Sequence, residues 1–169
     1  MKLGVFLSAL VLTAVTSTPP YDYLISLYQW PTVTTLSDGR TMRQVIVYMG
    51  NNAFEDAAAQ GQMFNAYMRV NNPATQVCTA QDVQASPIPS GKSWGAYAFQ
   101  LTYPKTTLPL KGKVRVPAIP TTQYVVTAQI SPEHPDGDKI TSNNYIQQSF
   151  TFPAGGTAAC VNLPRPQFH

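Results

Sequence analysis

The chain has 169 residues and a formal net charge of +3, which suits one domain and selects no particular charged partner. A chain of this size can bury enough surface to fold without a structural metal. Its 15 Pro and 10 Gly, together with few charged residues, favour short strands and turns over helices.

The first segment, residues 1–17, is predicted to be a secretory signal peptide. Lys2 supplies the positive start, the apolar run Leu3 to Val15 follows, and Val15-Thr16-Ser17 offers a cleavage site. An uncleaved anchor is the weaker interpretation, because a membrane-spanning helix needs about 20 apolar residues. We therefore expect an exported protein (secreted, periplasmic or at the cell surface) whose residues 18–169 form one domain with no stable membrane span.

Alternating apolar residues predict strands in the first half of the chain, over residues 21–30, 41–49 and 62–70. In the third of these, the predicted inward side chains are Phe64, Ala66, Met68 and Val70. Residues 53–60 are ambiguous. They follow a capping-box pattern, but Gly61 interrupts the stretch, and we expect a loop with at most one or two helical turns.

The second half of the chain predicts strands over residues 76–83, 92–103, 122–130 and 144–152. In the stretch 122–130, the predicted inward residues are Tyr124, Val126, Ala128 and Ile130, and Val125, Thr127 and Gln129 face outward. The Pro-rich stretch 104–120 is expected to be irregular, with room for a short strand at 113–116. About seven strands in one unit predict an all-β, immunoglobulin-like sandwich of two antiparallel sheets.

A basic cluster lies in the Pro-rich stretch, at Lys105, Lys111, Lys113 and Arg115. Few aromatic residues stand between these charges for bases to stack on, so we expect no nucleic-acid partner. Charges of this kind also protect a strand edge from pairing with another chain.

Cys78 and Cys160 are the two cysteines of the chain. In an exported protein they most simply form one disulfide, which would pin the C-terminal tail to the segment around Cys78. Two free thiols are the alternative. A zinc site is less favoured because no paired CxxC or HxxxH spacing occurs.

The mature chain resembles the CARDB-type domain, the immunoglobulin-like cell-adhesion-related domain found in bacteria. The likeness is carried by the stretches Asp22–Ile25, Val45–Asn52 with its continuation to Phe64, Pro87–Gly91, Val126–Ile130 and Asp138–Asn144. It implies an adhesion-related sandwich in which the pair Asn143-Asn144 begins the closing strand of a hairpin. Thr141-Ser142 stands where the family has an acidic pair, and we expect a single domain here whereas the family usually occurs in tandem.

Catalytic machinery is not predicted, and no cofactor is expected. His134 is the one internal histidine, and the chain has no GxSxG nucleophile motif. The two Glu residues, Glu55 and Glu133, lie in no strand that would fix either beside another acid.

Oxygen ligands for a weak Ca²⁺ site do gather in residues 136–144, where Asp136 and Asp138 precede Asn143 and Asn144. Their spacing matches no ordered Ca²⁺ loop, and a turn favours Asp and Gly in any case. We predict no metal site, and the sequence leaves open whether this loop binds one.

Three aromatic residues, Trp30, Tyr67 and Trp94, are candidates for a ligand-binding surface, because exposed rings can form a sugar- or peptide-binding face. The alternative is that the two Trp residues lie in the core or at the ends of the sandwich. The preferred hypothesis is a non-enzymatic binding or adhesion module for a protein or glycan at a cell surface. The alternative is a structural subunit of an appendage, layer or virion that assembles through sheet edges, so an oligomer is possible.

Overall fold

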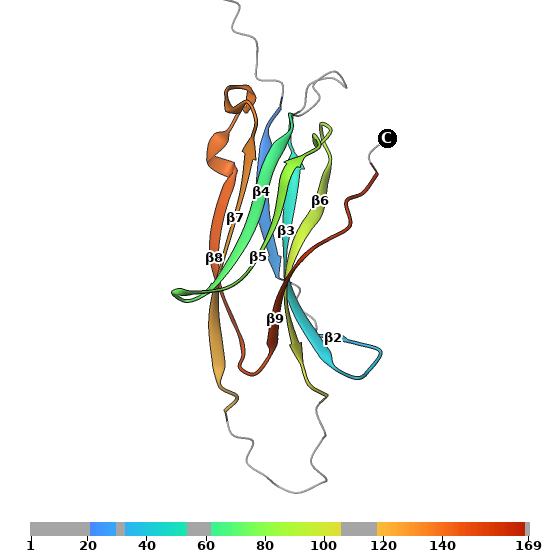
Figure 1. The fold of residues 1–169 in the computed structure, drawn as a ribbon, viewed down its shortest axis with the longest axis vertical. Coiled ribbons are helices and arrows are strands. Elements are labelled where there is room, and N and C mark those ends of the chain that lie inside the picture. Colours follow the sequence, from blue (N-terminus) through green and yellow to red (C-terminus); the bar gives the residue numbers. More distant parts are fainter. Residues whose placement is uncertain (1–20, 30–32, 54–61, 106–117, 168–169) are drawn as a thin grey trace, which may run out of the picture.

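The computed structural model describes residues 21–29, 33–53, 62–105 and 118–167, and these residues form two packed antiparallel sheets (Figure 1). One sheet has the strand order β1-β3-β6-β9, with β2 also pairing with β3, and the other has the order β5-β4-β7-β8. The strands are β1 (Tyr23–Gln29), β2 (Thr34–Thr35), β3 (Thr41–Asn51), β4 (Phe64–Asn72), β5 (Thr75–Ala85), β6 (Ser93–Tyr103), β7 (Thr121–Pro132), β8 (Tyr145–Pro153) and β9 (Thr157–Asn162). Two short 3₁₀ helices, η1 (Pro135–Gly137) and η2 (Thr141–Asn143), lie between β7 and β8.

The predicted all-β sandwich is confirmed, and its strand order is the immunoglobulin one with a single exchange. Strands β1, β3 and β6 take the places of immunoglobulin strands A, B and E, and β5-β4-β7-β8 forms the facing sheet. The place beside β6, which strand D occupies in an immunoglobulin domain, is filled by the C-terminal β9.

The seven predicted strands are all present, with boundaries shifted by a few residues, but the predicted total was too low. The structure adds β2 and β9. Strand β9 falls in the stretch that we expected to be only a disulfide-pinned tail. The signal peptide, nearly all of the ambiguous 53–60 stretch and the expected short strand at 113–116 lie outside the described residues.

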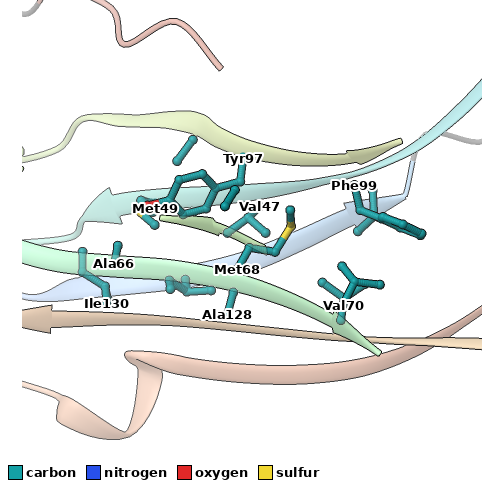
Figure 2. Close-up of a cluster of buried hydrophobic side chains, with 14 of the residues drawn as sticks. Val47, Met49, Ala66, Met68, Val70, Tyr97, Phe99, Ala128 and Ile130 are labelled. Atoms are coloured by element: carbon teal, nitrogen blue, oxygen red, sulfur yellow. The ribbon is translucent and has the colours of Figure 1, made fainter. Parts of the chain in front are cut away.

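The core lies between the two sheets, and it is built from the side chains that the alternation placed inward. Figure 2 shows residues of β3 and β6, such as Val47 and Phe99, pointing toward Met68 and Val70 of β4. The predicted inward sets of β4 and β7 are all buried. Since antiparallel strands with one wet face alternate strictly, the opposite set of each strand must form the outer face of the sheet.

Strand β6 departs from strict alternation because its pairing with β3 shifts between Val47 and Tyr48. Val47 is opposite Tyr97, and two positions further along β3, Met49 is opposite Trp94. The extra residue in β6 turns both aromatic side chains inward, as a β-bulge does. Trp94 is consequently only 7% exposed.

The predicted disulfide between Cys78 and Cys160 is present, with the two Cα atoms 5.6 Å apart. It joins β5 to β9, an edge strand of each sheet. Beside it, Asp82 of β5 accepts hydrogen bonds from Tyr97 Oη at 3.0 Å and from Asn162 Nδ2 at 3.1 Å. One flank of the sandwich is therefore closed by a covalent bond and a small polar network.

Strand β8 begins at Tyr145, so the pair Asn143-Asn144 precedes the closing strand instead of beginning it, and Asn143 ends η2. The side-chain amides of both asparagines face acidic residues. They donate to carboxylates, Asn143 Nδ2 to Asp22 at 3.0 Å and Asn144 Nδ2 to Asp138 at 2.7 Å. The pair thus joins the β7–β8 connection to the residue that precedes β1.

The described ranges contain no helix that is long and apolar enough to cross a bilayer.

Candidate ligand-binding face

The outer surface of the β5-β4-β7-β8 sheet is an open face rich in amide and hydroxyl groups, which we call the amide face. Its register brings side chains from all four strands into rows, because Tyr67 of β4 is paired with Gln81 of β5 and Gln129 of β7, and Gln129 is paired with Tyr145 of β8. The amide face is made of Asn65, Tyr67, Arg69, Thr79, Gln81, Thr127, Gln129, Ser131, Tyr145 and Gln147.

Hydrogen bonds connect neighbouring side chains on the amide face, both between β4 and β7 and within single strands. Tyr67 Oη donates to Gln129 Oε1 at 3.1 Å, and Gln129 Nε2 donates to Ser131 Oγ at 3.2 Å. On the β8 side, Tyr145 Oη donates to Gln147 Oε1 at 2.9 Å. These contacts fix the tyrosine and glutamine side chains in defined positions, which lowers the entropy cost of binding a ligand.

Arg69 is the one charged residue of the amide face, and its guanidinium carbon lies 5.7 Å from the centre of the Tyr67 ring. The face contains no Asp or Glu. Tyr145 is the most exposed aromatic residue there, at 49%, so one face of its ring is accessible to a ligand. The amide face can therefore donate and accept hydrogen bonds and can also stack on a flat apolar surface.

A shallow hollow of about 250 Å³ lies at one end of the amide face, lined by Gln129, Ser131, Thr141 and neighbouring residues. Enclosed small-molecule pockets are typically larger, about 300–1,000 Å³. The geometry therefore suits a ligand that lies along the open sheet and extends into this hollow.

The three aromatic residues singled out from the sequence lie in different places. Tyr67 is half-buried on the amide face. Trp94, in contrast, does not reach the surface, since it packs in the core near Phe64, and the Arg165 guanidinium carbon lies 4.7 Å from its ring centre. Trp30 lies outside the described residues. The structure does not place Tyr67 and Trp94 on one face.

Arg165 holds the C-terminal tail over this end of the core. Its guanidinium lies above the rings of Phe64 and Trp94 and donates to the carbonyl oxygens of Ser86 and Pro87. Burial lowers the pKa of Arg165. These contacts cover Trp94, so its role is in packing.

Sequence reasoning placed Gln129 on an outer face but did not identify Tyr145, Gln147 or Gln81 as its neighbours. Gln81 and Gln147 each follow a more buried apolar residue of the same strand, Ala80 and Ile146, so period-two alternation carries a signal for their exposure. The rows themselves depend on which strands pair and in which register, and a single sequence does not show this.

The residues considered for catalysis and for metal binding from the sequence lie mostly in the β7–β8 connection. His134 and Asp136 are exposed at the start of the β7–β8 connection, and Glu133 is exposed next to them. Among the described residues, no group of three or more His, Cys, Asp or Glu side chains is arranged to hold a metal ion.

Comparisons with protein-family profiles, with curated proteins and with solved structures give no match for this chain. The resemblance to CARDB-type domains therefore stays a prediction.

Proposed function

We propose that this chain is an exported, non-enzymatic binding module of CARDB-like type that attaches to a glycan at a cell surface through its amide face. The observation that carries the proposal is the row Gln81, Tyr67, Gln129 and Tyr145, which crosses all four strands of one sheet. The disulfide supports export, because disulfides persist in oxidising compartments.

The chemistry of the row favours a sugar over a protein surface. Glutamine amides and hydroxyl groups both donate and accept hydrogen bonds, as the hydroxyl groups of a sugar do, and a tyrosine ring offers a flat apolar surface to a sugar ring. Stable protein interfaces have an apolar core, whereas the exposed positions here are mostly amide and hydroxyl groups. Arg69 favours a neutral or acidic glycan over a basic ligand.

Replacing Tyr145 with alanine is expected to weaken glycan binding by about 5-fold or more, because loss of an aromatic contact at a binding site typically costs more than about 1 kcal/mol. Tyr28 provides a matched control, since it is 48% exposed against 49% for Tyr145 but lies on β1 of the opposite sheet. The measurement is a glycan array with the purified protein, followed by titration of the best ligand with Tyr145→Ala and Tyr28→Ala. A blank array, or equal losses in the two variants, would contradict the proposal.

A specific feature favours a second function, assembly through sheet edges. Strand β8 pairs with β7 without a bulge, and no described strand pairs with its other side. Its sequence from Tyr145 to Pro153 carries no charged residue, whereas natural edge strands are usually protected by charges or bulges. The other edge of the same sheet, β5, has two irregularities in its pairing with β4. A second copy of the chain is the occupant that could extend this sheet.

A lysine placed on β8 tests this alternative. If the chain self-associates through β8, Ser149→Lys is expected to convert the oligomer into a monomer, because an edge lysine opposes strand addition. Gln81→Lys, on the opposite edge strand β5, serves as the control and is expected to leave the association unchanged. Sedimentation velocity over a concentration series measures the result, and a strictly monomeric unaltered chain at high concentration would exclude assembly through β8.

A further inference from the structure

Two buried carboxylates, Asp22 and Asp138, lie close together at the end of the sandwich where the chain enters β1. Asp22 is 3% exposed and Asp138 is 7% exposed. They come from distant parts of the sequence, and the bridge between Tyr21 and Asp138 together with the 3.0 Å hydrogen bond from Lys139 N to Tyr21 O brings the two segments side by side.

Neither carboxylate has a cationic partner among the described residues, where the one ion pair joins Arg40 and Asp38. Their side-chain partners are neutral amides, Asn143 for Asp22 and Asn144 for Asp138. Buried charges are normally paired or bound to a metal ion, so this pair of carboxylates has a charge that its own contacts do not neutralise.

A second, independent feature lies on the same two amides. The Oδ1 atoms of Asn143 and Asn144 are enclosed by protein and have no hydrogen-bond donor. Asn144 is only 7% exposed, and its side chain is turned toward Asp138. Buried acceptors without a partner are rare in folded proteins. A half-turn of each amide would direct its oxygen toward the carboxylate that its nitrogen now faces.

From these contacts we infer that the side chains of Asp22, Asp138, Asn143 and Asn144 form a Ca²⁺-binding site between β1 and the β7–β8 connection. Carboxylate and amide oxygens are ligands that Ca²⁺ accepts in irregular arrangements, whereas Mg²⁺ demands a near-ideal octahedron. A divalent ion would neutralise both carboxylates and satisfy both amide oxygens. A water molecule would satisfy the amides alone.

The four residues form no recognisable sequence motif, because only two of them are acidic and because Asp22 is remote from the other three in the sequence. Ca²⁺ would join β1 to the β7–β8 connection, at the side of the sandwich opposite the Cys78–Cys160 bond. With two carboxylate ligands, we expect a dissociation constant of about 10⁻⁴–10⁻³ M, as in extracellular Ca²⁺ modules.

Thermal unfolding of the purified protein in CaCl₂, MgCl₂ or NaCl at equal ionic strength tests the inference. Ca²⁺ at about 1 mM is expected to raise the melting temperature by about 1–6 °C, with little change in the other two salts. Asp138→Asn should abolish the shift. Asp136→Asn is the matched control, because Asp136 lies two residues away in the same connection but is exposed, and it should keep the shift.

A direct titration keeps the inference testable if Asp138→Asn does not fold. Tb³⁺, which occupies Ca²⁺ sites, should show luminescence when Tyr21 and Tyr23 beside the cluster are excited, and Ca²⁺ should displace it saturably from the unaltered protein. Equal melting temperatures in all three salts, or the absence of sensitised luminescence, would overturn the site. Loss of the shift in Asp136→Asn as large as that in Asp138→Asn would show diffuse attraction of cations and would overturn it as well.

Discussion

Replacing Asn51 with alanine is expected to lower the free energy of unfolding by about 3 kcal/mol, because it leaves several buried backbone groups without partners. Asn51 is 2% exposed. Its Oδ1 accepts hydrogen bonds from Asp22 N at 3.0 Å and from Ala53 N at 3.2 Å, and its Nδ2 donates to Ile88 O at 2.9 Å. One side chain thus ties the start of β1 to the turn before β6.

Asn52 offers the control for this experiment, because it is the next residue and its side chain is exposed. Asn52→Ala should change the stability by no more than about 0.5 kcal/mol, as surface substitutions usually do. Urea unfolding measures both variants, and a loss of stability should appear as a lower midpoint at constant slope. Equal midpoints for the two variants would show that the hydrogen bonds of Asn51 contribute little.

Removal of the Cys78–Cys160 disulfide, by substituting both residues with alanine, is expected to cost about 2–5 kcal/mol. The bond closes a loop with a sequence separation of 82 residues, for which the chain-entropy estimate is about 4.5 kcal/mol as an upper value. The first consequence should be loosening of β9, since β6 is its only partner strand in the described sheet.

The unaltered chain in reducing buffer is the control, and it should match the double alanine variant, because both lack the cross-link. Hydrogen exchange should then rise in β9 while the β3–β6 pairing stays protected. If the oxidised and reduced chains unfold at the same denaturant concentration, the disulfide does not stabilise this sandwich.

Much of the fold could be predicted because each sheet has one face in the core and the other exposed to solvent. Phe64, Ala66, Met68 and Val70 alternate with polar residues, and burial of one face requires that pattern. Strand β9 was missed because Ala158, Ala159 and Cys160 have small side chains and little pattern. Its extended form depends on pairing with β6 and on the cross-link to β5, which are contacts remote in sequence.

The candidate site could be predicted only in part, for a similar reason. Alternation identifies Gln129 as exposed, but the row that it forms with Tyr67 and Tyr145 depends on strand register. Trp94 shows the opposite case. A bulge in β6 lets both Trp94 and Tyr97 face inward. Strict alternation of inward and outward residues would place these two side chains on opposite faces.

The position of the disulfide also determines how the molecule responds to mechanical tension. A force applied between the start of β1 and the C-terminal tail passes from Cys78 directly to Cys160, so β6, β7 and β8 lie outside the stretched path. The cross-link prevents the segment between the two cysteines from extending. At about 3.4 Å per residue, its separation of 82 residues corresponds to about 280 Å of extended chain. The half of the amide face that β7 and β8 contribute therefore stays out of tension while the oxidised chain is pulled.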